Sequence, residues 1–116
     1  MYRTAYLTLM VRDIDQSVRF YTQTLGLPLK ERYGDHWAGV EAPGVTIGLH
    51  PAGDHPSQRP RGDAISLGLL VDDLDAAVQE LTGRGVTFSR ITGNESARSA
   101  YFSDPDGVTL YLMQRS

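Results

Sequence analysis

The side chains in this sequence that could recognise a ligand are mostly hydroxyls and aromatic rings, and they recur at alternate positions of β-rich stretches. Tyr6, Thr8 and Met10 alternate in one such stretch, and Tyr111 and Met113 do so in another. Alternate residues of a strand point to the same face, so these groups would share a surface suited to a flat or ring-bearing small molecule. The residues that we expect to contact such a ligand are Tyr6, Thr8, Met10, Trp37, Gly48, His50, Ser66, Gly68, Thr109, Tyr111 and Met113.

Acid–base catalysis is an alternative use of the same groups. His50, Tyr111 and Tyr6 are the candidate catalytic residues, and histidine is the side-chain type that changes charge near neutral pH. The candidate positions include no Asp or Glu, so they lack the paired carboxylates that would argue for acid–base work. A nucleophilic role for Ser66 has less support, because no Gly-x-Ser-x-Gly elbow surrounds it. The residues therefore leave enzyme and binding protein open, and they favour binding.

Residue types that bind metals are scarce. The chain has no cysteine, which excludes disulfides, thiolate chemistry and Cys-based metal sites. Its three histidines are His36, His50 and His55. They could share a metal only if the segment around His55 folded inward, and a solvated surface histidine is the simpler interpretation of His55.

Length and charge narrow the class of protein. A chain of 116 residues is expected to form one compact domain, residues 1–116. The net charge of −3 and the lack of a basic stripe argue against nucleic acid as a partner. No apolar run approaches the length of a membrane span, and the N-terminus lacks a signal-peptide pattern. We therefore expect a cytoplasmic protein with no membrane partner.

An internal repeat organises the chain. Residues 44–49, Gly-Val-Thr-Ile-Gly-Leu, match residues 107–112, Gly-Val-Thr-Leu-Tyr-Leu. Residues 9–15 match residues 69–75 in the same order and at nearly the same offset. Two matched pairs in one order indicate a single structural unit that is used twice.

Each copy is expected to run strand, helix, then three strands. Asp13 and Asp73 are the predicted helix N-caps, and Gly26 is the predicted end of the first helix. The predicted strands are residues 2–11, 29–33, 36–41, 45–50, 64–71, 86–90, 99–102 and 108–113. The predicted organisation is a first module at 4–50, an exposed linker at 51–63, a second module at 64–115, and a polar rim or lid at 91–98.

Two such units could pair their sheets around a shared cleft, with a helix outside each. Aliphatic residues suit a helix-packed face, so Leu7, Leu9 and Val11 are expected under the first helix. Leu110 and Leu112 are expected under the second. The polar and aromatic residues between them would then face the cleft.

Three stretches resemble the vicinal oxygen chelate superfamily, which includes glyoxalase I, the extradiol dioxygenases, fosfomycin resistance enzymes and bleomycin resistance proteins. They are residues 11–21, residues 25–27 (Leu-Gly-Leu) and residues 102–107 (Phe-Ser-Asp-Pro-Asp-Gly). The resemblance implies an α+β fold, in which two tandem βαβββ modules form a curved mixed-sheet cup. It also implies a homodimer.

The metal-dependent members of that superfamily hold a divalent ion with four side chains, usually His or Glu. Carried over by motif, those positions are Tyr6, Gly48, Ser66 and Tyr111 here. Glycine has no side-chain donor, and serine and protonated tyrosine are weak ligands for a divalent ion. We therefore predict no metal and no other cofactor.

The expected function is that of a metal-independent small-molecule-binding protein of the glyoxalase/bleomycin resistance type, which could sequester a drug or secondary metabolite. A metal-free isomerase, lyase or cyclase is the alternative, and a metal-dependent glyoxalase-like or dioxygenase-like enzyme has less support. The lack of acidic candidate residues predicts a neutral, aromatic or weakly anionic ligand.

Overall fold

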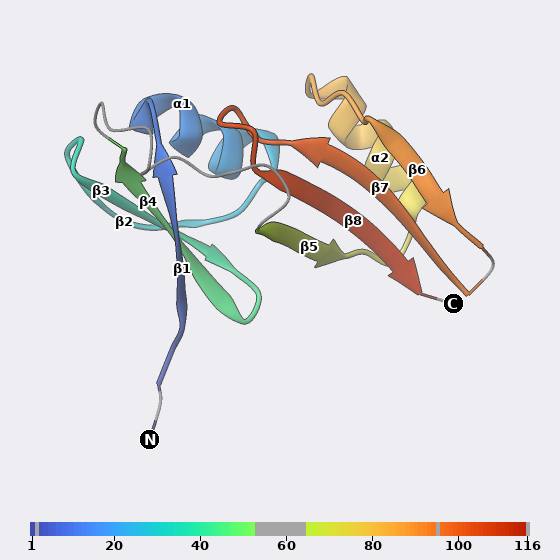
Figure 1. Cartoon of the computed structure of the whole chain (residues 1–116), viewed down its shortest axis with the longest axis horizontal. Coiled ribbons are helices and arrows are strands. Elements are labelled where there is room, and N and C mark those ends of the chain that lie inside the picture. Colours follow the sequence, from blue (N-terminus) through green and yellow to red (C-terminus); the bar gives the residue numbers. More distant parts are fainter. Residues whose placement is uncertain (2, 53–64, 95, 116) are drawn as a thin grey trace. The chain divides into compact units, whose positions relative to one another are not determined.

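The computed structural model describes residues 1, 3–52, 65–94 and 96–115. The chain divides into two compact units, Met1–Pro60 and Arg61–Ser116. Each unit runs strand, helix, strand, strand, strand, and each contains a four-stranded sheet (Figure 1). The predicted α+β class and the two tandem βαβββ modules are therefore confirmed.

The first module contains a mixed sheet. Its elements are β1 (Tyr6–Val11), α1 (Ile14–Arg19), a π-helical turn η1 (Phe20–Thr24), β2 (Leu29–Tyr33), β3 (Trp37–Ala42) and β4 (Val45–Pro51). The strand order is β1-β4-β3-β2, with β1 parallel to β4 and the other pairs antiparallel.

The helical segment of the first module begins and ends as the sequence predicts. The Asp13 carboxylate accepts a hydrogen bond from the Gln16 N–H at 3.1 Å, as an N-cap does. Gly26 ends the segment with a φ of 81°, a conformation that glycine adopts without steric cost. The last turn is wider than an α-helix, because the Leu25 N–H donates to the Phe20 carbonyl five residues earlier.

The second module repeats this plan. Its elements are β5 (Ser66–Leu70), α2 (Leu74–Gly83), β6 (Arg90–Gly93), β7 (Ala97–Ser103) and β8 (Thr109–Arg115). The strand order is β5-β8-β7-β6, with β5 parallel to β8. The Asp73 carboxylate caps α2 by accepting from the Ala76 N–H at 3.1 Å.

The predictions for residues 86–98 are wrong in two respects. The strand predicted at 86–90 begins only at Arg90, and the predicted polar rim or lid at 91–98 is a hairpin between β6 and β7. Gly93 turns the chain with a φ of 116°, and the Asn94 side chain accepts from the Ser96 N–H at 2.8 Å. All residues of β6 are exposed at the sheet edge, so this strand has no apolar alternation to reveal it.

Burial alternates along β1 and β8 as period two predicts, whereas four consecutive residues of the central strand β4, Thr46 to Leu49, are buried. On β1, Leu9 and Val11 are buried, whereas Tyr6 and Thr8 are exposed. On β8 the buried positions are Leu110 and Leu112, and the residues that alternate with them, Thr109, Tyr111 and Met113, are half-buried. The helix of each module packs against its sheet, and we call the opposite face of each sheet its open face.

A turn fixed by one buried carboxylate joins β7 to β8. Asp104 is 5% exposed, and its Oδ1 accepts from the N–H groups of Asp106 at 2.9 Å and Val108 at 2.8 Å. Gly107 completes the turn with a φ of 86°. The Asp-Pro-Asp-Gly motif thus sets where β8 begins.

The predicted linker at 51–63 falls mainly outside the described residues, as does His55. Its first residue, Pro51, is the last residue of β4. Within the described part of the chain, neither α-helix has the length and apolar character that crossing a membrane requires.

Candidate functional site

The open face of the second sheet carries a hollow of about 450 Å³, within the range of small-molecule sites. The residues that line it are Ser66, Arg90, Ser99, Tyr101, Thr109, Tyr111 and Met113. Five of the seven carry hydroxyl groups and two of those are aromatic. Four of them, Ser66, Thr109, Tyr111 and Met113, are among the predicted ligand contacts.

One cross-strand row forms the centre of this hollow. Strand register places Arg90 opposite Tyr101, Tyr101 opposite Tyr111, and Tyr111 opposite Gly68. The two tyrosine rings lie 5.5 Å apart between centroids with 36° between their planes. The Arg90 guanidinium carbon lies 4.4 Å from the Tyr101 ring centroid, within cation–π range.

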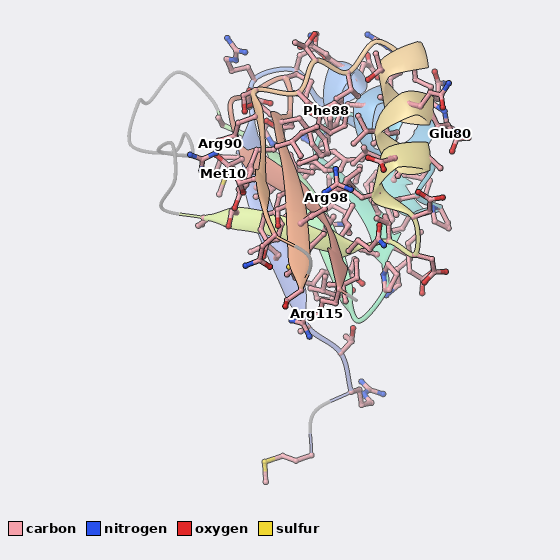
Figure 2. The ribbon with its side chains drawn as sticks, turned by 90° about the vertical axis from the view of Figure 1, so that its right-hand side faces the viewer. Met10, Glu80, Phe88, Arg90, Arg98 and Arg115 are labelled. Atoms are coloured by element: carbon pink, nitrogen blue, oxygen red, sulfur yellow. The ribbon has the colours of Figure 1, made fainter. Side chains whose placement is uncertain are left out.

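Gly68 lets the Tyr111 ring lie across the sheet. A Cβ built on Gly68 would overlap that ring, reaching 2.6 Å from Cε2, so any larger residue would displace the tyrosine. Gly68 is therefore the residue of β5 on which the Tyr111 ring rests. Figure 2 shows Arg90 on the side of this sheet that faces away from α2.

The open face of the first sheet carries a second aromatic group. The indole of Trp37 covers Gly48, and a Cβ at that position would lie 2.9 Å from the ring atom Cζ2. The Tyr6 ring lies 6.1 Å from the Trp37 ring between centroids. Trp37 and Tyr6 therefore lie near each other on this face, with Gly48 beneath the Trp37 indole, and their contact with a ligand stays a prediction.

A carboxylate that sequence reasoning missed orients Trp37. Glu31 accepts from the Trp37 Nε1–H at 3.3 Å and from the Tyr33 hydroxyl at 3.3 Å. Its side chain lies over Gly39, where a Cβ would come within 3.1 Å of the Glu31 Cγ. The β2 register shifts between Leu29 and Glu31, and a sequence pattern gives no sign of such a bulge.

Lys30 belongs to the same surface. Its ammonium nitrogen lies 5.4 Å from the Tyr6 ring centroid and 3.4 Å from the Thr46 hydroxyl, to which it donates. The first open face therefore carries both charge signs beside its aromatic rings.

The remaining predicted contacts, Thr8, Met10 and His50, lie on β1 and β4. Thr8 is opposite Gly48, and Met10 is opposite His50. His50 is exposed, and its Nδ1 lies 2.8 Å from the Pro51 carbonyl oxygen. A carbonyl oxygen can only accept, so Nδ1 carries the proton and Nε2 is the nitrogen able to accept one.

The residues at the superfamily's metal-binding positions do not fit a divalent ion. Gly48 offers no donor, and the Trp37 indole fills the space that a ligand side chain would need there. Ser66 and Tyr111 supply only hydroxyls to the second module's face. Among residues 1, 3–52, 65–94 and 96–115, no three His, Asp or Glu side chains gather as a metal site would require, and His36 lies in an exposed turn.

A smaller hollow of about 310 Å³ lies at the start of α1, beside Asp13, Asp15 and Asp35. Arg32 hydrogen-bonds Asp15, and this bond and the opposite charge hold the pKa of Asp15 below its usual range. The same pairing raises the pKa of Arg32. These charges satisfy each other, so we assign this hollow a structural role.

Sequence reasoning missed three residues that line the second module's hollow, namely Arg90, Ser99 and Tyr101. Period two along β7 places Ser99 and Tyr101 on one face, which is a usable signal. Arg90 needed the β6–β7 register, because only its position opposite Tyr101 brings it to the open face.

Comparison with known proteins gives matches over most of the chain. An uncharacterized protein of Mycolicibacterium smegmatis is 34% identical over 79 residues, which cover 68% of this chain and 64% of that protein. A Serratia marcescens protein named glutathione transferase FosA is 32% identical, over 92% of this chain and 77% of its own length.

A solved structure is similar over the full length. TnmS3, described as an antibiotic binding protein from a Streptomyces species, has a TM-score of 0.77 and 30% identity, covering 100% of this chain and 98% of that one. The Glyoxalase/Bleomycin resistance protein/Dioxygenase family pattern matches residues 3–112. The chain therefore belongs to the glyoxalase/bleomycin resistance protein/dioxygenase superfamily.

Proposed function

We propose that this chain is a metal-independent small-molecule-binding protein whose ligand is a drug-like compound or secondary metabolite. The observation that carries the proposal is the row of Tyr101 and Tyr111 across a hollow of about 450 Å³. Half-buried aromatic rings surrounded by hydroxyls give a ligand both apolar contact and hydrogen bonds. Such a site needs no metal to bind a planar compound.

Similarity to TnmS3 supports the same function. That protein is described as antibiotic binding, and it matches this chain from end to end at 30% identity. The resemblance also leads us to propose a homodimer, which light scattering after size-exclusion chromatography would test. A monomer at micromolar concentration would contradict the dimer and leave the binding site of the second module unaffected.

Thermal unfolding with a ligand panel tests binding directly. A ligand at 100 times its Kd stabilises the folded state by about 2.7 kcal/mol, which for a chain of this size raises Tm by roughly 10 °C. The panel would hold coumarins, flavones and naphthalenes beside their saturated analogues. We expect stabilisation by planar compounds, and a panel without a single stabilising member would contradict the proposal.

Metal analysis of the purified protein tests the proposed metal independence. We expect purified protein to contain far less than one equivalent of zinc, nickel, manganese or iron, and EDTA to leave ligand binding unchanged. Stoichiometric metal, together with loss of binding in EDTA that the metal restores, would overturn metal independence.

The relative named glutathione transferase FosA favours an enzyme as the second candidate function. In that case His50, Tyr111 or Tyr6 would move a proton in a metal-free isomerase, lyase or cyclase. His50 has its Nε2 available to take a proton, because Nδ1 donates to the Pro51 carbonyl. Turnover that disappears in His50→Ala or Tyr111→Phe, while ligand binding persists, would favour the enzyme.

A further inference from the structure

We infer that the hollow of the second module selects planar aromatic acids, with the ring system on Tyr101 and Tyr111 and the acidic group at Arg90. This inference rests on the proposed binding function and narrows it to one chemical class. It concerns only the open face of the second sheet.

The preference for an acidic ligand is inferred first from the charge of the hollow. Of its seven lining residues, Arg90 is the only one with a charge, and the others are hydroxyl-bearing residues and Met113. Within the described part of the chain, no carboxylate forms an ion pair with Arg90. A ligand with a negative group would therefore gain an attraction that a neutral ligand lacks.

The position of Arg90 carries the second step. The residue stands at the β6 end of the row that runs through Tyr101 and Tyr111 to Gly68. Its contact with Tyr101 is to the ring face, at 4.4 Å from the centroid, and none of its described contacts occupies its N–H donors. Arginine has five N–H donors in a fork that matches a carboxylate, so they remain available to an anion beside the rings.

The shape of the row carries the third step. The Tyr101 and Tyr111 rings lie 5.5 Å apart between centroids, and both residues are half-buried. Because Gly68 has no side chain, the Tyr111 ring can lie directly over the β5 backbone. Two neighbouring rings with 36° between their planes offer a broad apolar surface. A fused planar ring system covers more of it than a puckered one of the same carbon count.

Arg98 gives a matched comparison within the same sheet. It lies on β7 but forms an ion pair with Asp75 of α2 at 3.1 Å, so its side chain lies on the face of the sheet opposite the hollow. Figure 2 shows Arg98 on the α2 side of the sheet and Arg90 on the other side. R90Q and R98Q therefore remove the same charge from the same sheet, and only R90Q alters the hollow.

The test compares three probes by fluorescence or NMR titration. Naphthalene-2-carboxylate is the planar acid, naphthalene-2-carboxamide is its neutral counterpart, and decahydronaphthalene-2-carboxylate is its saturated counterpart. We expect the wild-type protein to bind the planar acid about fivefold more tightly than the amide, as an exposed ion pair allows. The saturated acid should bind more weakly than the planar acid.

The variants decide where any preference arises. R90Q should abolish the preference for acid over amide, and R98Q should retain it. R90K should retain part of it, because lysine keeps the charge without the planar fork. Higher ionic strength should weaken binding of the planar acid and leave the amide unaffected.

Three results would overturn the inference. They are equal affinity for acid and amide in the wild-type protein, a preference that survives in R90Q, and a saturated acid that binds as tightly as the planar one. If the amide binds as well as the acid, the proposed binding function stands and only the selection of acids fails. If neither naphthalene probe binds and no panel compound stabilises the protein, both fail.

Discussion

At the scale of single residues, two glycines decide which aromatic rings occupy the open faces. Gly48 lies under the Trp37 indole, and Gly68 lies under the Tyr111 ring. The glycine under the ring occupies a different strand in each module: Gly48 is on the last strand of the first module, and Gly68 is on the first strand of the second. The position that matches Gly48 in the second copy of the repeat is Tyr111. The repeat thus keeps its core residues and differs on the face where we place the ligand.

Gly48→Ala tests the packing of the first open face. The added methyl overlaps the Trp37 ring and must displace it, so we expect a loss of about 1–3 kcal/mol in unfolding free energy. Trp37 is the only tryptophan, so its emission should shift to the red as the ring moves into solvent. Gly83→Ala is the control, because nothing lies within 4 Å of that position, and unchanged emission in Gly48→Ala would contradict the packing.

Gly68→Ala tests the ring row of the second open face. Displacing Tyr111 breaks its contact with Tyr101, so affinity for naphthalene-2-carboxylate should fall by about fivefold. Gly83→Ala adds the same methyl group where nothing lies within 4 Å, and it should leave that affinity unaltered. Equal affinity of the wild-type protein and Gly68→Ala for this compound would show that Tyr111 does not contact the ligand.

At the scale of elements, the turn between β7 and β8 depends on Asp104. Asp104→Ala removes the acceptor of two backbone N–H groups, those of Asp106 and Val108, so we expect a loss of about 2–4 kcal/mol in unfolding free energy. Asp104→Asn keeps an oxygen at that position and should lose less. Urea unfolding gives both values, and an alanine variant as stable as wild type would contradict this role of the carboxylate.

The ion pair between α1 and β2 predicts a dependence on pH. Arg32 lowers the pKa of Asp15, so the pair stabilises the folded state above the ordinary Asp pKa of about 3.9. That contribution is lost as the pH falls through the lowered pKa. Asp15→Asn should therefore have a lower Tm than wild type near pH 7, and the two should converge in acid.

Arg32→Gln serves as the control for that pair, since it removes the other partner and should give the same convergence. In the double variant, Asp15→Asn should add little to Arg32→Gln, which also removes the contacts of Arg32 with Asp35 and the Gly34 carbonyl. A difference between Asp15→Asn and wild type that persists unchanged into strong acid would show that the pair is not its source.

At the scale of the whole molecule, the sequence predicts the repeat well and the open faces only in part. The matched segments at 44–49 and 107–112 lie largely in β4 and β8. The buried residues of β8 follow period two, whereas four consecutive residues of the central strand β4 are buried. The bounds predicted for edge strand β6 are wrong because all its residues, Ile91 included, are exposed and show no alternation of apolar and polar positions. The sequence also does not predict Arg90 and Glu31 as residues of the open faces. The β6–β7 register brings Arg90 to its face, and the bulge in β2 brings Glu31 to the other.

The most direct test of the account is to map where a planar aromatic acid binds. Naphthalene-2-carboxylate, added in EDTA to isotopically labelled protein, should shift the backbone resonances of Gly68, Ser99, Tyr101 and Tyr111 at a common Kd. Resonances of α2, on the other face of the second sheet, should remain in place. Shifts confined to α2 or to the charged hollow at the start of α1, or binding that appears only after metal is added, would contradict the account.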